Sequence, residues 1–90
     1  MYKLEITSRY KKDLKRAKAR GLDINDLQTV LEYLIIGEPL PPIYRNHKLS
    51  GQYKGLWECH ISPDWLLIYD TNHEIKLLTL VRTGTHSDLF

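Results

Sequence analysis

The chain has 90 residues, of which 42% are hydrophobic, and a formal net charge of +2. This length fits one domain with one modest hydrophobic core, and the hydrophobic content excludes a disordered chain. The single cysteine, Cys59, excludes an internal disulfide, and no apolar run is long enough for a signal peptide or a membrane-spanning helix. We therefore expect one soluble, cytoplasmic domain over residues 1–90.

Positive charge is concentrated at the beginning of the chain. Residues 1–20 carry +6, from eight Lys or Arg and two acidic residues, whereas residues 21–90 carry −4. A basic face attracts phosphate groups, although exposed lysines and arginines are also ordinary on a solvated helix. The candidates for phosphate contacts are Lys11, Lys12, Lys15 and Arg16.

The first half of the chain is predicted to form a strand and two helices. Apolar residues alternate over residues 1–6, as in a short strand. A basic amphipathic helix then begins at an N-cap in Thr7-Ser8 and ends at Gly21, which can adopt the left-handed conformation found after helices. Asp23 can cap a second helix with a broad apolar stripe, which ends at Gly37. These two helices would form a hairpin.

The second half is predicted to form an antiparallel meander. The proline-rich residues 40–43 read as an extended connector, because they can continue neither a helix nor a central strand. Strand patterns follow at 53–61, 65–69 and 75–82, separated by turn formers. Residues 66–68 are apolar on both faces, so the central strand is expected to be covered on both sides. The expected fold class is α+β, with an N-terminal strand and a two-helix hairpin packed on a small antiparallel sheet.

Titratable side chains gather in the second half. Of the four histidines, His73 lies among turn formers and reads as an exposed loop residue. His47 taken alone also fits an exposed or structural position. Histidine titrates near pH 6.5 and can exchange protons at neutral pH, while arginine stays charged and can bind phosphate. The set that suits acid–base cleavage of RNA without a metal is His47, His60, Asp64, Arg82 and His86.

Two local arrangements support this set. A tight turn at Ser62-Pro63 can bring the imidazole of His60 and the carboxylate of Asp64 within reach of each other. Arg82 precedes Thr83-Gly84-Thr85-His86, where hydroxyl groups and a flexible glycine can line an anion site. Each arrangement also has a simpler interpretation, namely a locally hydrogen-bonded histidine and a C-terminal loop without a role.

Two other kinds of active site fit the sequence less well. Cys59 and the histidines are possible zinc ligands, but the chain has neither a Cys-x-x-Cys pair nor a His-Glu-x-x-His helix. Cys59 and His60 are adjacent, so a strand points them to opposite faces. No serine lies in a Gly-x-Ser-x-Gly turn, and no glycine-rich phosphate loop is present. We therefore expect neither a metal nor a cofactor.

Three segments carry a resemblance to a known family. Residues 46–53 read NHKLSGQY, residues 58–69 read ECHISPDWLLIY, and residues 82–90 read RTGTHSDLF. In this order and spacing they resemble the YafQ family of bacterial toxins, a branch of the RelE/ParE-like superfamily, and the resemblance covers essentially the whole chain. It implies a RelE-like α+β fold and a toxin that cleaves messenger RNA at the ribosome.

The resemblance also implies site residues and partners. The catalytic positions of the family fall on His47, His60, Asp64, His86 and Phe90. Arg82 and Trp65 match the motif as neighbours that bind substrate or phosphate, and the basic first helix would contact ribosomal RNA. A DinJ-like antitoxin would neutralise the toxin in a heterotetramer that binds operator DNA through the antitoxin. No catalytic position is substituted, so the chemistry is expected to be intact.

The expected reaction is attack of a ribose 2′-hydroxyl on the adjacent phosphorus, which gives a 2′,3′-cyclic phosphate. His86 is the expected general acid and His60, with Asp64, the expected base, while His47 contacts phosphate or ribose. The positive charge of Arg82 would stabilise the phosphorane. Phe90 would stack on a base, and its simpler interpretation is a hydrophobic anchor for the chain end.

Two other classes of function stay open at this point. The superfamily fold also includes ParE-like toxins directed at DNA gyrase, which have no ribonuclease site and would leave the histidines without a purpose. A non-enzymatic RNA-binding module could use the basic helix but would not need titratable groups near an arginine. Alanine at His86 separates these classes, because only an enzyme would lose activity by orders of magnitude.

Overall fold

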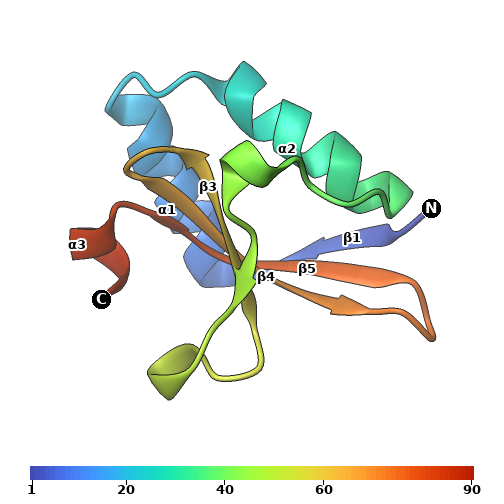
Figure 1. Cartoon of the computed structure of the whole chain (residues 1–90). Helices are drawn as coiled ribbons and strands as arrows, with labels where there is room; N and C mark the ends of the chain where they lie inside the picture. Colours follow the sequence, from blue (N-terminus) through green and yellow to red (C-terminus); the bar gives the residue numbers. More distant parts are fainter.

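A five-stranded mixed sheet with the strand order β1-β5-β4-β3-β2 forms the centre of the protein (Figure 1). The computed structural model describes every residue from Met1 to Phe90. The strands are β1 (Lys3–Ile6), β2 (His47–Lys48), β3 (Trp57–Ser62), β4 (Trp65–Asn72) and β5 (Leu77–Gly84). The helices are α1 (Ser8–Ala19), α2 (Ile24–Ile36) and α3 (His86–Leu89), with short 3₁₀ turns at Pro42–Tyr44 and Gly51–Tyr53.

The first two helices begin and end at the predicted signals. The Thr7 hydroxyl accepts a hydrogen bond from the backbone of Tyr10 at 3.0 Å, and the Asp23 carboxylate accepts one from the backbone of Asn25 at 2.9 Å. Gly37 ends α2 in a left-handed conformation with φ of 79°. The predicted helical hairpin is therefore confirmed. Neither of its helices, nor α3, is long and apolar enough to cross a bilayer.

The sheet differs from the prediction in its edge and its strand limits. Strands β3, β4 and β5 form the predicted antiparallel meander, but β1 joins β5 in parallel, so the sheet is mixed. The predicted strand at 53–61 begins only at Trp57, because a 3₁₀ turn and Gly55, with φ of 90°, reverse the chain before it. The connector after α2 is also not fully extended, because Pro42 begins a 3₁₀ turn.

Both faces of the central strand are buried, as the sequence predicts. Leu67 and Tyr69 of β4 pack with Tyr10 of α1 and Val30 of α2 in the larger hydrophobic cluster. The other face carries a smaller cluster of Leu66, Ile68 and Leu89. The two long helices thus cover one face, while the C-terminal helix and the loop before β3 cover part of the other. Figure 1 shows α3 and the C terminus at the end of the sheet opposite to the N terminus.

Candidate active site

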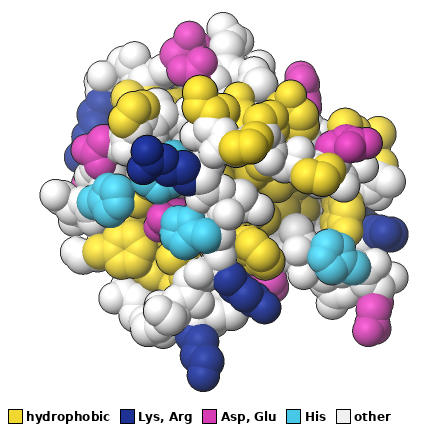
Figure 2. Space-filling view, viewed as in Figure 1, with side chains coloured by type: hydrophobic (Ala, Val, Ile, Leu, Met, Phe, Trp, Pro, Cys, Tyr) yellow, Lys and Arg dark blue, Asp and Glu magenta, His cyan; other side chains and the backbone are white.

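Three histidines and the terminal phenylalanine form a row on the sheet face opposite to the long helices. Ring centroids are 6.3 Å apart for His47 and His60, 5.9 Å for His60 and His86, and 6.3 Å for His86 and Phe90. These residues come from β2, β3, the start of α3 and the chain end. Figure 2 shows the histidines grouped on this face, with another histidine well apart from the group. The fold therefore gathers side chains that are up to 43 positions apart in sequence.

A buried carboxylate lies beneath two of the histidines. Glu58 pairs with His47 across β2 and β3, and His60, two positions further along β3, projects to the same face. One carboxylate oxygen, Oε1, lies 3.3 Å from Nε2 of His47 and 3.8 Å from Nε2 of His60. The Glu58 side chain is only 4% exposed, and its other oxygen, Oε2, has no hydrogen-bond partner. A single buried carboxylate thus contacts two imidazoles.

His47 is held at both ring nitrogens. Its Nδ1 lies 2.8 Å from the backbone carbonyl of Arg45, to which it can only donate, and its Nε2 faces the Glu58 carboxylate. Both neighbours can act only as acceptors, and the two contacts together fix the orientation of the ring. The sequence did not assign a role to Glu58. Its signal is an acidic residue two positions before His60 in an otherwise apolar strand, which the strand period places beside the histidine.

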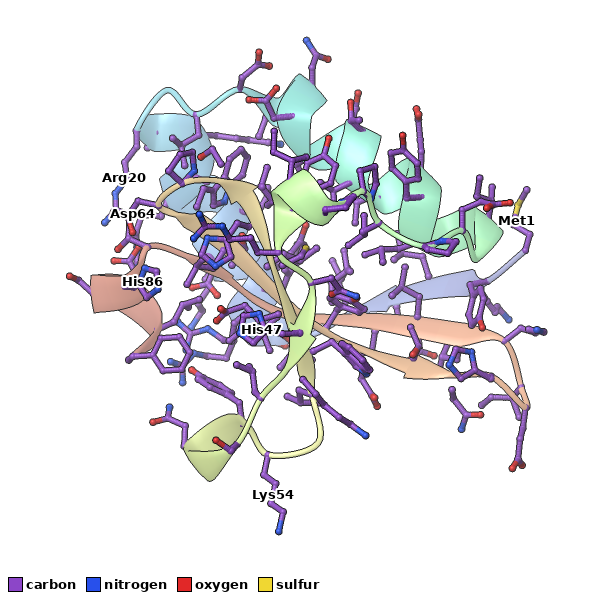
Figure 3. The ribbon with its side chains drawn as sticks, viewed as in Figure 1. Met1, Arg20, His47, Lys54, Asp64 and His86 are labelled. Carbon is purple, nitrogen blue, oxygen red and sulfur yellow. The ribbon has the colours of Figure 1, made fainter.

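Asp64 pairs with His86, which corrects the expected partnership with His60. Its Oδ1 lies 3.3 Å from both the backbone nitrogen and Nδ1 of His86. Hydrogen bonds from the His86 backbone and ring lower the pKa of Asp64. The register of β3 and β4 is irregular between His60 and Ser62, so the turn carries Asp64 away from His60 and toward α3. Figure 3 shows Asp64 and His86 next to each other, with His47 on the other side of the site.

The C-terminal motif fixes the position of His86. The Thr85 hydroxyl accepts from the Asp88 backbone at 3.1 Å, and the Asp88 carboxylate accepts from the Thr85 backbone at 2.9 Å, which forms a capping box. Gly84 leaves room for this carboxylate, because a Cβ there would lie 2.8 Å from Asp88 Oδ2. Arg20 of α1 binds both Asp88 oxygens at 2.6 and 3.1 Å and lowers the pKa of Asp88. The short helix that carries His86 is thereby tied to α1.

Trp65 is not a surface residue of the site, contrary to the expectation from the resemblance. Its side chain is 1% exposed and lies in the larger hydrophobic cluster. The indole Nε1 donates to the Thr83 hydroxyl at 2.9 Å, and this hydroxyl donates to the Leu66 carbonyl at 2.6 Å. A tryptophan side chain in the core cannot contact bound RNA. Trp65 instead supports the sheet beneath the site. The expected contact of Trp65 with substrate is wrong.

Arg82 is held in an ion pair that the sequence did not predict. Its Nε and Nη2 lie 2.6 and 3.1 Å from the two oxygens of Asp13, a buried residue of α1. Its Nη1 lies 3.4 Å from the Tyr53 hydroxyl, which in turn donates to the Leu89 carbonyl at 2.9 Å. Most N–H donors of the guanidinium are therefore occupied. We expected Arg82 to be free to bind phosphate, and in the structure it is instead bound to Asp13.

Phe90 is exposed at the chain end, beside His86. Its ring packs edge-on against Tyr53 with centroids 5.3 Å apart, and 59% of the residue remains exposed. An anchor for the chain end would be buried, so the exposure of Phe90 argues against that simpler interpretation. The stacking of Phe90 on a base stays a prediction.

The remaining candidates lie away from this row. Lys11, Lys12 and Lys15 are exposed on α1, while Arg16 forms an ion pair with Asp88 at 3.3 Å. His73 is exposed, as predicted, and contacts the Tyr2 hydroxyl. Three of the four predicted phosphate contacts are therefore free of salt bridges, and the fourth, Arg16, binds the C-terminal helix.

Comparisons with known proteins show the family to which the chain belongs. Residues 2–90 match the family model of the YafQ toxin, a bacterial toxin of type II toxin-antitoxin systems. The chain is 43% identical over 88 residues to the mRNA interferase toxin YafQ of Escherichia coli K12, covering 97% of this chain and 94% of that protein.

Solved structures give the same result. The chain resembles YafQ in the E. coli DinJ-YafQ complex, with 40% identity, a TM-score of 0.90 and coverage of 100% of this chain and 99% of that chain. It also resembles a metal-bound toxin from Helicobacter pylori, with 40% identity, a TM-score of 0.92 and full coverage of both chains. The chain therefore belongs to the YafQ family of bacterial toxins of type II toxin-antitoxin systems.

Proposed function

We propose that this protein is a cytoplasmic, ribosome-dependent endoribonuclease that cleaves messenger RNA and thereby inhibits translation. The observation that carries the proposal is the convergence of His47, His60 and His86, with ring centroids about 6 Å apart, around two carboxylates. The name of the E. coli relative, mRNA interferase toxin, supports the same activity. Residues 1–90 would act as one toxin domain.

The proposed reaction proceeds by acid–base catalysis. His60 takes the proton of a ribose 2′-hydroxyl as its oxygen forms a bond to the adjacent phosphorus. The bond from phosphorus to the 5′-oxygen breaks, and His86 donates a proton to that oxygen. The products are a 2′,3′-cyclic phosphate and a 5′-hydroxyl. Each positioned proton transfer typically contributes about 10² to 10⁴ in rate.

The two carboxylates support these roles differently from the sequence-based expectation. Glu58, rather than Asp64, lies beside His60 and stabilises positive charge on the ring after proton uptake. Asp64 holds Nδ1 of His86, which leaves the other ring nitrogen to face the leaving oxygen. His47 adds positive charge near the phosphodiester when protonated.

Phe90 and Arg82 have positioning roles in this proposal. The exposed Phe90 ring would stack on a base of the target nucleotide, an interaction of roughly 1–3 kcal/mol. Arg82 binds Asp13 and approaches Tyr53, the residue against which Phe90 packs. We therefore assign Arg82 a role in holding this platform, in place of a direct bond to phosphate.

The proposed reaction does not use a metal. One H. pylori relative is described as metal-bound, but in this chain no group of three or more His, Cys, Asp or Glu is arranged to hold a metal ion. Burial, together with the charge of Glu58, raises the pKa of the Cys59 thiol to about 12, so the thiol stays protonated at neutral pH.

The partners in this proposal are the ribosome and a DinJ-like antitoxin. The E. coli relative has been solved as a DinJ-YafQ complex, and we infer an equivalent heterotetramer here, bound to operator DNA through its antitoxin. Exposed lysines of α1 would contact ribosomal RNA through phosphates.

Charge reversal on α1 tests the ribosome contact. Replacing Lys11, Lys12 and Lys15 with Glu should abolish cosedimentation with ribosomes and leave the folded structure intact, because all three side chains are exposed. The logarithm of the binding constant falls linearly with the logarithm of the salt concentration. Each lost phosphate contact should make this slope shallower by about 0.9 or less. Arg16 is left unchanged because it binds Asp88. Unchanged cosedimentation would refute the contact.

Primer extension on a defined message in a reconstituted translation reaction tests the activity. Wild type should cut at specific sites only when ribosomes are present, and His86→Ala should reduce cutting by about 10² to 10⁴. His73→Ala is the matched control, because His73 lies outside the row, and it should cut like wild type. Cutting should persist when EDTA is added, provided that magnesium is present in excess over EDTA so that the ribosomes stay intact.

An intact message with wild-type protein would overturn the proposal, and a DNA supercoiling assay would then test a gyrase-directed toxin.

A further inference from the structure

An open groove of about 780 Å³ lies beside the histidine row and is lined in part by His60. The 3₁₀ turn at Pro42–Tyr44 and the end of β3 form its walls, and Asp26 of α2 also lines it. None of the proposed proton transfers uses this groove. Its volume falls within the range of about 300–1,000 Å³ that is usual for ligand sites.

Arg45 is the only lysine or arginine that lines the groove. The residue is exposed, and it takes part in none of the salt bridges of the protein, unlike Arg16, Arg20 and Arg82. An exposed arginine without a partner, next to a candidate phosphodiester site, is suited to bind a phosphate.

The backbone of Arg45 is fixed in an uncommon conformation. Its φ is 48°, in the left-handed region that residues other than glycine seldom adopt. Its N–H donates to the Pro42 carbonyl at 3.0 Å, and its carbonyl accepts from Nδ1 of His47. The same residue therefore contacts one histidine of the row through its backbone and also lines the groove. Such strained positions are frequent at binding sites.

The walls of the groove are mostly apolar. Ile43 is 79% exposed although it is a large hydrophobic residue, and Tyr44 adds an aromatic ring. Asp26 is the one acidic residue in the lining and would repel a second phosphate. The groove offers Arg45 for one phosphate, Asp26 against a second phosphate, and apolar walls for a base or ribose. This lining fits a single nucleotide better than several consecutive phosphates of an RNA backbone.

We propose that this groove binds the nucleotide next to the cleaved phosphodiester, with Arg45 on its phosphate and Ile43 against its base or ribose. The inference rests on the proposed ribonuclease function. A strand whose reacting phosphate lies between His60 and His86 must continue past one of them, and the groove begins at His60. Arg45 is thus a binding residue that favours RNA with at least one further nucleotide beyond the cleaved phosphodiester.

Binding of short RNAs tests the groove directly. The probe is a fluorescent oligoribonucleotide with a 2′-O-methyl group at the cleavage site, measured by anisotropy, together with two versions that lack the nucleotides on one side of that site. Arg45→Gln should weaken binding of the full probe about ten-fold and should have no effect on one of the two shortened probes. Arg45→Lys, which keeps the charge, should recover part of the affinity.

Lys54→Gln is the matched control, because it also removes one positive charge and Figure 3 shows Lys54 projecting away from Asp64 and His86. Its binding should stay within two-fold of wild type. In ribosome-dependent cleavage, Arg45→Gln should raise KM and leave kcat and the pH profile unchanged. A change in the pH profile would instead mean that Arg45 acts only by holding His47, and would overturn the proposal.

The outcomes separate this inference from the proposed function. Failure of the ribonuclease function would appear as a wild-type protein that cuts no RNA. Failure of the groove alone would appear as normal cutting by the wild-type protein, with Arg45→Gln binding each of the three probes as tightly as wild type does. Normal RNA binding by Arg45→Gln with lost neutralisation by the antitoxin would assign the groove to the antitoxin and overturn the inference.

Discussion

The two carboxylates of the candidate site differ most in their exposure to solvent. Glu58 is 4% exposed and serves two histidines from within the sheet, whereas Asp64 is 69% exposed and holds His86 at the edge of the site. Water screens an exposed charge, so its effect on a neighbouring imidazole is weaker than that of a buried charge. The buried half of the site should therefore contribute more to catalysis, and the exposed half more to orientation.

The largest expected effect comes from neutralising each carboxylate in turn. Glu58→Gln should lower the cleavage rate by about 10², because His60 and His47 lose a poorly screened charge, while Asp64→Asn should lower it only about ten-fold. Single-turnover cleavage on ribosomes measures both.

Salt sharpens this comparison. Added salt should reduce the effect of Asp64→Asn, which acts through solvent, and leave that of Glu58→Gln almost unchanged. Equal losses in the two variants, with equal salt dependence, would contradict the assignment of a buried and an exposed half.

A stability measurement tests the buried half independently of catalysis. Oε2 of Glu58 has no hydrogen-bond partner, and an unsatisfied buried polar group typically costs about 1–3 kcal/mol. Glu58→Leu should therefore raise the free energy of unfolding by about 1 kcal/mol in urea denaturation while it removes activity. A clear loss of stability would mean that the contacts of Glu58 with His47 and His60 outweigh the cost of its burial.

The smallest expected effect is on the stability of α3, the helix that carries His86 in the exposed half of the site. Hydrogen bonds from Arg20 lower the pKa of Asp88, so this pair stabilises the folded protein above the unfolded carboxyl pKa of about 3.9. This stabilisation is lost as the pH falls below about 4, through the folded pKa.

Arg20→Gln should accordingly lower the melting temperature at pH 6 and have a smaller effect at pH 2. Lys18→Gln is the control for loss of one charge, because Lys18 is an exposed residue in the last turn of α1. A difference between Arg20→Gln and wild type that does not shrink on acidification would contradict the coupling between α1 and α3.

Local signals in the sequence predicted the helical half and the direction in which His60 points from its strand. The side chains of Thr7 and Asp23 cap the helices within two or three residues, and Gly37 ends the second helix through its own backbone conformation. The strand pattern also placed His60 on the face opposite to Cys59, as the burial of Cys59 in the larger cluster confirms. These features depend on near neighbours, which a single sequence displays.

The partners of the charged groups could not be predicted in this way. Arg82 binds Asp13, which lies 69 positions earlier, and Asp64 binds His86, which lies 22 positions later. The spacing of His60 and Asp64 suggested a pair, but the irregular turn between β3 and β4 separates them. Such contacts depend on strand register and helix docking, which arise only when the whole chain packs.

The pH dependence of cleavage tests the central claim most directly. Hydrogen bonds from His86 lower the pKa of Asp64, so this carboxylate stays ionised through the neutral range and the pH dependence reports the histidines. The single-turnover rate on ribosome-bound message should follow a bell-shaped curve between pH 5 and pH 9, because one histidine must accept a proton and another must donate one. A rate that stays flat across this range would contradict acid–base catalysis by the histidine row.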